Sequence, residues 1–269
     1  SVVLGAGGFS VVLPGRSKAE AEIFCNTAVK KNHMSDVRNE VRHLISCRGH
    51  PNILQYRGMF FLEAEEEAQF ETLIAARHRR RKWEGPAKYA LVFELFTLGD
   101  MWQLVNVMGV IPESTALSIM IGLFSALAYI HEKKIVHRDV KSENIMMRCN
   151  GDAVLADFGL AMVIPAHQEI CQRAGSAGYA APEQLASDCK YGLKVDVFGA
   201  GVCLYFALAR SLPFNGVDKE AIIAATRNCR PDFESHLFRE VSTDTIRLGQ
   251  PTTNNQQPTT TYKLTNKQQ

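Results

Sequence analysis

The feature that most constrains this chain is a pair of polar motifs near its middle. Residues 135–144 read Ile-Val-His-Arg-Asp-Val-Lys-Ser-Glu-Asn, and residues 157–159 read Asp-Phe-Gly. The two motifs bring carboxylates, a carboxamide and positive charge into a short span. Asp139 by itself would be interpreted as a solvated loop residue, but the combination predicts a functional site.

The segment between the motifs predicts how they meet. Asn150-Gly151 stands between two mostly apolar runs, and this dipeptide is the strongest short-range hairpin signal because both residues tolerate positive φ. An ideal two-residue turn there puts Asn144 opposite Asp157, about 4.5–5.5 Å apart at Cα. Their oxygens would form a site suited to Mg²⁺, and Asp139 would stay free to accept a proton from a hydroxyl.

The order and spacing of the motifs resemble the catalytic and metal-binding loops of eukaryotic protein kinases. The resemblance implies an α+β, bilobal protein kinase-like fold, with a small β-rich N-lobe, a larger and mostly helical C-lobe and the active site in the cleft. It implies ATP and Mg²⁺ as cofactors and protein substrates as partners. In this scheme Asp139 orients the substrate hydroxyl and Lys141 neutralises the transferring phosphoryl oxygens, while Asn144 and Asp157 hold the magnesium ions.

Lys141, two residues after Asp139, resembles the Ser/Thr type of kinase rather than the Tyr type. The sequence also resembles, loosely, the calcium/calmodulin-dependent group, without a calmodulin-binding helix or an EF-hand loop. The alternative function is a catalytically weak or inactive pseudokinase that acts as a nucleotide-binding scaffold. Intact Lys30, Asp139 and Asp157 favour the enzyme. A kinase of small molecules is disfavoured by Ala181-Pro182-Glu183, which resembles a segment that serves protein substrates.

The first residues predict a strand, a glycine turn and a second strand over residues 2–13. Glycines let the backbone approach phosphates with amide N–H groups directed at them, although alone this pattern favours an ordinary hairpin. Beside the two motifs it resembles the kinase loop over ATP. Gly5 and Gly7 stand in the first two glycine positions, Ser10 stands in the third, and Val12 is implied to pack on the adenine.

The strand Thr27-Ala28-Val29-Lys30 resembles the kinase strand that ends in a phosphate-binding lysine. The resemblance implies ATP contacts for Ala28 and Lys30. It assigns Glu40, on a helix expected over residues 35–46, to hold Lys30 in place. The ordinary alternatives are an exposed strand-end lysine and a surface glutamate. The helix prediction depends on four apolar residues at helical spacing: Val37, Val41, Leu44 and Ile45.

A buried strand over residues 89–96 runs into a linker. By resemblance, the main chain of Glu94 and of Phe96 would hydrogen-bond the adenine edge. Asp100 falls where kinases place a ribose contact, and Met146 would cap the adenine from below.

Residues 63–88 pass from a glutamate-rich half to an arginine-rich half. This charge order suits a helix dipole. Against the kinase pattern the segment is an insertion between two neighbouring strands. A solvated helical excursion is the favoured interpretation, and docking of a regulatory partner is the alternative.

The segment after Asp-Phe-Gly, residues 160–175, contains no Ser, Thr or Tyr. Many kinases become active when such a loop is phosphorylated and arginines bind the phosphate. Arg138 is present without an acceptor in this span, so we expect a kinase that is not activated there. Glu169 could supply a permanent negative charge, and Ser176 and Tyr179 remain possible modification sites.

Further along, residues 175–183 resemble the substrate-docking stretch of kinases. Ser176 stands where a threonine usually bonds the catalytic aspartate and lysine, and Asp196 is implied to anchor the catalytic loop. His137 and Phe158 are interpreted as packing residues that stack with Leu44 in the family.

The predicted organisation is an N-lobe over residues 1–94, a hinge over 95–100, a C-lobe over 101–248 and a disordered tail over 249–269. The tail is rich in Thr, Gln, Asn and Pro. The C-lobe is incomplete at its end, because the family's terminal arginine that pairs with the residue at Glu183 has no counterpart.

Composition places few further limits. A net charge of +2 on 269 residues argues neither for nor against nucleic acid, which the resemblance does not call for. Seven scattered cysteines without metal spacing indicate reduced thiols, so we expect an intracellular, cytoplasmic protein. The longest strongly apolar stretch, Val197 to Ala209, is too short to span a bilayer and predicts a buried helix instead.

Overall fold

The computed structural model describes residues 5–6, 10–16, 23–30, 34–61, 87–165 and 168–250. The chain divides into two compact units, residues 1–97 and 98–269, so that the division falls inside the predicted hinge. Unit 1 holds most of the described strands, and unit 2 is mostly helical. The α+β prediction is therefore confirmed.

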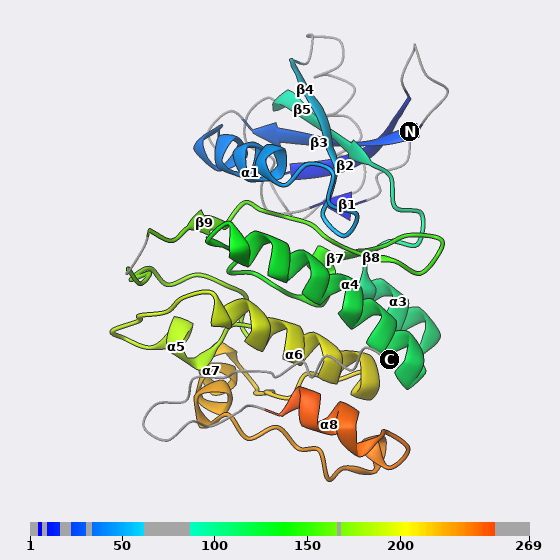
Figure 1. Cartoon of the computed structure of the whole chain (residues 1–269), viewed down its shortest axis with the longest axis vertical. Helices are drawn as coiled ribbons and strands as arrows, with labels where there is room; N and C mark the ends of the chain where they lie inside the picture. Colours follow the sequence, from blue (N-terminus) through cyan, green and yellow to red (C-terminus); the bar gives the residue numbers. More distant parts are fainter. Residues whose placement is uncertain are drawn as a thin grey trace. The chain divides into compact units, whose positions relative to one another are not determined.

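An antiparallel sheet dominates the described part of unit 1, with five strands in the order β1-β2-β3-β5-β4 (Figure 1). Helix α1 connects β3 to β4 along the chain. The elements are β1 (Gly5–Ala6), β2 (Ser10–Arg16), β3 (Ile23–Lys30), α1 (Met34–Ser46), β4 (Tyr56–Phe61) and β5 (Ala87–Glu94).

Helix α1 confirms the helix expected over residues 35–46. Val37 and Leu44 are buried, whereas Ile45 is 56% exposed. The buried stripe also includes His43 and Cys47, which are four positions apart. The imidazole Nδ1 of His43 lies 2.8 Å from the Asn39 carbonyl oxygen, so the polar ring is satisfied inside the helix.

The predicted insertion does lie between neighbouring strands, because β4 and β5 pair directly. Its end was misplaced: β5 begins at Ala87, so residues 87 and 88 belong to the sheet. Residues 62–86 lie outside the described residues, and a docking role for this segment stays a prediction.

Unit 2 is built from helices and short strand pairs. The helices are α3 (Met101–Met108), α4 (Glu113–Glu132), α5 (Pro182–Leu185), α6 (Lys194–Ala209), α7 (Lys219–Asn228) and α8 (Thr243–Gly249), with 3-10 turns η2 (Ser142–Asn144) and η3 (His236–Phe238). Strands β6 (Ile135–Val136) and β9 (Met162–Val163) pair, as do β7 (Ile145–Met147) and β8 (Ala153–Leu155).

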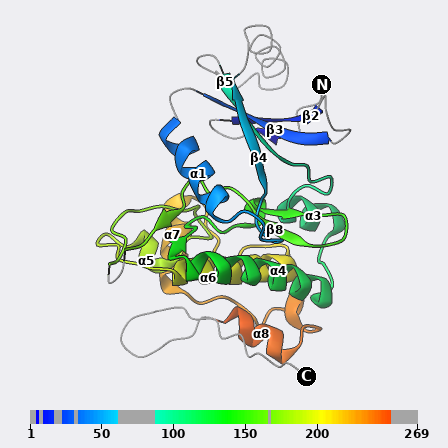
Figure 2. The same ribbon diagram turned by 45° about the horizontal axis from the view of Figure 1, so that its top comes forward.

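Helix α6 forms the centre of unit 2. It packs against both α4 and α8 and lies between them (Figures 1 and 2). Nearly all of its side chains are buried, which confirms the helix predicted from the apolar run. Helix α4 begins directly after Pro112, a residue that suits helix starts. It is also apolar and long enough to cross a membrane, but almost half of its apolar window is buried in the protein, as expected of a core helix.

The hairpin between the two motifs is present, but its predicted register is wrong by one residue. Ile145 faces Leu155, and the Ala156 amide donates to the Asn144 carbonyl at 2.9 Å, so Asn144 faces Ala156 rather than Asp157. The predicted turn needs positive φ at both Asn150 and Gly151. Only Gly151 has it, at +87°, and the hairpin closes with a three-residue loop that ends in this left-handed glycine.

The end of α8 corrects the predicted start of the tail. Gly249 is the last residue of the helix and is buried. A Cβ atom on Gly249 would lie 3.0 Å from the ring of Phe233, which in turn contacts Tyr205 and Phe238. Gly249 therefore belongs to an aromatic cluster of the core. Residues 251–269 lie outside the described residues.

Candidate active site

The loop that carries Asp139 is held by one buried carboxylate on α6. Asp196 is 1% exposed, and its two oxygens accept the backbone amides of His137 and Arg138, both at 2.8 Å. The His131 ring lies 2.8 Å from the same carboxylate. Because the two amides donate to different oxygens of the Asp196 carboxylate, the backbone that leads to Asp139 is held in one orientation. The predicted anchoring by Asp196 is confirmed.

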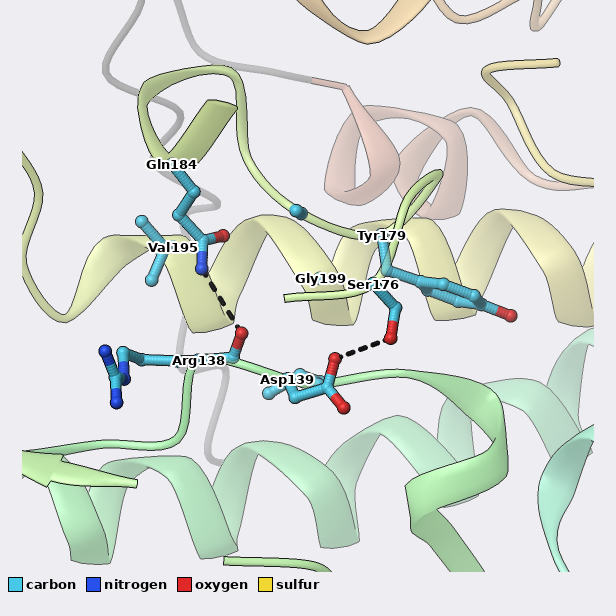
Figure 3. Close-up of a pocket in the computed structure, with 9 residues that line it drawn as sticks. Arg138, Asp139, Ser176, Tyr179, Gln184, Val195 and Gly199 are labelled. Carbon is cyan, nitrogen blue, oxygen red and sulfur yellow. Dashed lines mark hydrogen bonds between the residues drawn. The ribbon is translucent and has the colours of Figure 1, made fainter. Parts of the chain in front are cut away.

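Asp139 lies at the centre of a small polar cluster (Figure 3). It is 7% exposed, and the Ser176 hydroxyl donates to its Oδ1 at 2.8 Å. The Lys141 ammonium lies 2.5 Å from Asp139 Oδ2 and also donates to Ser176 Oγ at 3.0 Å. The predicted bonds from Ser176 to both partners are therefore present. They tie the catalytic loop to the segment expected to receive a substrate.

Asn144 lies directly behind this cluster. Its Nδ2 donates to the Asp139 carbonyl at 2.9 Å and lies 3.4 Å from Asp139 Oδ2. Both contacts use nitrogen, so the amide oxygen, which is the atom a cation would bind, takes no part in them.

Asp157 is near Asn144 through the hairpin, since it follows Ala156, the ladder partner of Asn144. Its backbone is left-handed, with φ of +60°, and its Oδ1 accepts the Gly159 amide at 3.2 Å. Asp157 is exposed, whereas Phe158 is buried and packs edge-on against His137, with ring centroids 4.9 Å apart. The packing role of Phe158 and His137 is confirmed; a contact with Leu44 stays a prediction.

Two of the residues assigned to ATP meet in unit 2. Asp100 forms a β-bridge with Met146, and the Met147 amide donates to the Gly99 carbonyl at 2.9 Å. The Asp100 carboxylate caps α3 by accepting the Gln103 amide at 2.8 Å. Burial raises the pKa of Asp100, the bond from Gln103 opposes this rise, and the nearby Glu143 charge adds to it.

Most site residues expected in unit 1, namely the ATP contacts and Glu40 that was assigned to hold Lys30, fall on its strands and helix. Gly5 faces Val12 across β1 and β2, and Ala28 pairs in the middle of β3. Lys30 is the last residue of β3, and Glu40 is half-buried on α1. Gly7 lies outside the described residues.

Glu94 ends β5, and its side chain accepts the Gln55 amide at 3.1 Å. Phe96 lies two residues beyond and is half-buried. ATP contacts of Glu94, Phe96 and the other unit 1 residues stay predictions.

Gln184 is a site residue that the sequence did not reveal. It is buried, its Oε1 accepts the Ala181 amide at 2.8 Å, and its Nε2 donates to the Arg138 carbonyl at 3.2 Å (Figure 3). Gln184 thereby joins the docking stretch to the catalytic loop. Its place directly after the Ala-Pro-Glu motif was the sole sequence signal, and that signal does not specify these bonds.

A glycine on α6 lets the helix approach the same loop. A Cβ atom on Gly199 would lie 2.7 Å from the Val140 carbonyl oxygen, closer than real contacts allow. Opposite, the Tyr179 hydroxyl lies 2.6 Å from Ser142 Oγ, and burial raises the pKa of Tyr179. The loop is thus packed on both sides.

Among the described residues, Glu183 is the side chain near the site that has an unsatisfied buried atom. Its Oε2 is buried and has no hydrogen-bond partner within the described part of the chain. Burial raises the pKa of Glu183, while a hydrogen bond from its own backbone and, more weakly, the Lys194 charge oppose this rise.

Replacing Glu183 by Gln is expected to stabilise the protein at neutral pH. A carboxyl whose pKa is raised by folding costs stability above its unfolded value of 4.5, so wild-type stability falls as pH rises from 4.5 through the folded pKa. After allowance for solvent screening we expect a gain of about 1 kcal/mol at pH 8, which should shrink towards pH 5. Thermal unfolding across this range measures it.

The matched control is Glu240→Gln, because Glu240 is exposed. Equal unfolding temperatures of Glu183→Gln and the wild type at pH 8 would contradict the prediction that the buried Glu183 charge costs stability.

Comparison with known proteins agrees with this geometry. The chain matches the protein kinase domain family over residues 1–259. This match extends beyond residue 248, where the C-lobe was predicted to end. It is 34% identical over 239 residues to serine/threonine-protein kinase PEPKR2 of Arabidopsis thaliana, covering 89% of this chain and 45% of that protein. It is 31% identical over 245 residues to human calcium/calmodulin-dependent protein kinase type IV, covering 89% of this chain and 46% of the relative.

A third relative, calcium-dependent protein kinase 5 of Plasmodium berghei, is 27% identical over 250 residues, covering 91% of this chain and 40% of that protein. The chain thus spans less than half the length of each of these three relatives.

Proposed function

Because the chain belongs to the protein kinase family, we propose that it transfers the γ-phosphoryl group of ATP to serine or threonine hydroxyls of protein substrates. The observation that carries this proposal is the cluster of Asp139, Lys141 and Ser176. A carboxylate that is oriented by a hydroxyl and an ammonium is suited to receive a substrate hydroxyl. The name of the related serine/threonine-protein kinase PEPKR2 supports the same substrate class.

The residues present fit a magnesium ion bound together with ATP. No group of three or more His, Cys, Asp or Glu that could hold a metal occurs among the described residues. Magnesium in kinases needs only one or two protein oxygens, because phosphates and water complete its shell. The Asn144 amide oxygen and the exposed Asp157 carboxylate would hold it, and the ion would neutralise charge on the phosphate oxygens.

In the proposed mechanism the protein mainly positions and stabilises. Asp139 orients the substrate hydroxyl and accepts its proton, and Lys141 lies beside it to stabilise negative charge on the phosphoryl oxygens. The Ser176 bond keeps the Asp139 carboxylate directed towards the docking stretch. Rigid positioning of this kind supplies much of the rate enhancement in phosphoryl transfer.

Partners and location are further parts of the proposal. Residues 63–86 of the insertion would dock a regulatory partner through their separated charges. A cytoplasmic location is proposed from the scattered cysteines without metal spacing, of which Cys47, Cys149, Cys171, Cys189, Cys203 and Cys229 are free thiols.

Phosphate transfer from radiolabelled ATP to a generic basic protein tests the function. We expect transfer with Mg²⁺, loss of transfer to background when EDTA removes the metal, and label on phosphoserine and phosphothreonine after acid hydrolysis. A folded protein that binds ATP but transfers nothing would contradict the proposal and favour the pseudokinase scaffold. Label on phosphotyrosine alone would contradict the substrate class.

A further inference from the structure

The segment that leads to Ser176 has no phosphate acceptor of its own. Residues 160–175 contain no Ser, Thr or Tyr. In kinases that are switched by phosphorylation, new arginine–phosphate pairs order this segment. A phosphate within residues 160–175 therefore cannot position Ser176 against Asp139 in this chain.

Arg138 is held so that its side chain has a defined direction. Its amide donates to Asp196 at 2.8 Å, its carbonyl accepts from Gln184 at 3.2 Å, and its backbone is left-handed with φ of 70°. The residue is 7% exposed. Its Nε donates to the Leu160 carbonyl at 2.6 Å, which fixes the plane of the guanidinium and leaves the other nitrogens for a second partner.

That second partner is Gln172. Arg138 Nη1 donates to the Gln172 side-chain oxygen at 3.0 Å. The same residue is bound through its main chain, because the Tyr191 hydroxyl donates to the Gln172 carbonyl at 2.5 Å. Ile170 and Tyr191 also exchange two backbone hydrogen bonds, at 2.9 and 3.2 Å. Gln172 is thus tied by side chain and backbone four residues before Ser176.

We propose that Gln172 is a positioning residue whose carboxamide takes the place of a phosphate at Arg138, so that the segment carrying Ser176 is ordered without phosphorylation. This inference deepens the proposed function and rests on it. A carboxamide oxygen offers a guanidinium a neutral but permanent acceptor, and hydrogen bonds to charged donors are stronger than neutral ones. The hydrogen bond between Arg138 and Gln172 depends on the tertiary fold, because the two residues are 34 positions apart in the sequence.

The other candidates for this role are engaged elsewhere. Ser176 Oγ bonds Asp139 and Lys141, and the Tyr179 hydroxyl is buried against Ser142. A phosphate on either would break these bonds. Glu169, expected as a possible permanent charge, is exposed and is not among the hydrogen-bond partners of Arg138 in the described segment. We therefore assign to Gln172 the role as permanent partner of Arg138 that had been considered for Glu169.

The test compares Gln172→Ala with Gln172→Glu in the phosphatase-treated chain, shown by mass spectrometry to carry no phosphate. Gln172 is exposed, so neither change disturbs the core. For Gln172→Ala we expect a fall in kcat of about tenfold, which is the worth of one hydrogen bond to a charged group, with KM for ATP unchanged. Hydrogen–deuterium exchange at residues 168–176 should become faster. Gln172→Glu should keep wild-type values, because its carboxylate can pair with Arg138.

Gln168→Ala is the matched control, since Gln168 is an exposed glutamine of the same segment and should behave as wild type. The proposal is overturned if Gln172→Ala matches Gln168→Ala in both measurements, or if the wild type loses activity on phosphatase treatment. The exchange measurement does not depend on catalysis. A chain that transfers no phosphate in any form would therefore refute the proposed function while the exchange rates still decide the role of Gln172.

Discussion

Replacing Asp139 by Asn is expected to lower phosphoryl transfer by about 10²–10⁴-fold, the usual worth of a positioned general base. The carboxylate accepts from Ser176 at Oδ1 and from Lys141 at Oδ2. An asparagine keeps the shape but turns one acceptor into an NH₂ donor that faces another donor. It also cannot take the proton of the substrate hydroxyl. Initial rates of ³²P transfer with and without the substitution measure the effect.

Asp244→Asn is the control for Asp139→Asn. Asp244 lies on α8 with its side chain 94% exposed, so its loss should leave the rate unchanged. Thermal unfolding must show that the Asp139 variant remains folded. A folded Asp139→Asn protein with more than about a tenth of the wild-type rate would exclude Asp139 as the base, since general bases contribute more than that.

Replacing Asp196 by Ala is expected to destabilise the protein by about 3–5 kcal/mol and to abolish transfer. The change leaves the buried amides of His137 and Arg138 without acceptors, and each unsatisfied buried group costs about 1–3 kcal/mol. The loop that carries Asp139 then loses the bonds that set its backbone. Urea unfolding gives the free energy, and activity is compared below the unfolding midpoint.

Asp218→Ala provides the comparison for Asp196→Ala. Asp218 is the exposed N-cap of α7 and accepts one amide, that of Ala221, at 2.8 Å, so its loss should cost only about 1 kcal/mol and leave transfer intact. Equal destabilisation by the two substitutions would show that Asp196 is an ordinary cap rather than the anchor of the catalytic loop.

Much of the candidate site could be predicted because its residues lie close together in the sequence. Asp139, Lys141 and Asn144 occupy one loop, and their mutual contacts span five positions or fewer. Helix patterns were also local, since the apolar run on α6 predicted a buried helix. Family resemblance then supplied the more distant partners Ser176 and Asp196.

The errors came from conformations that residue types allow without requiring them. Asn150 tolerates positive φ, but only Gly151 adopts it, and this one difference moved the hairpin register by a residue. Gly249 was interpreted as the start of a polar tail, yet it ends α8 and is buried, with a Cβ atom there tight against the Phe233 ring at 3.0 Å.

The sequence by itself determined which chemical groups are available at the site: a carboxylate, an ammonium and an amide within one loop, and a following segment without a phosphate acceptor. Only the tertiary structure decided which of these groups form hydrogen bonds and which residues are their partners. The Asp196 carboxylate reaches His137 across 59 positions, and Arg138 reaches Gln172 across 34. The physical reason is that a buried hydrogen bond depends on burial and geometry, and these are set by how distant segments pack rather than by local propensity.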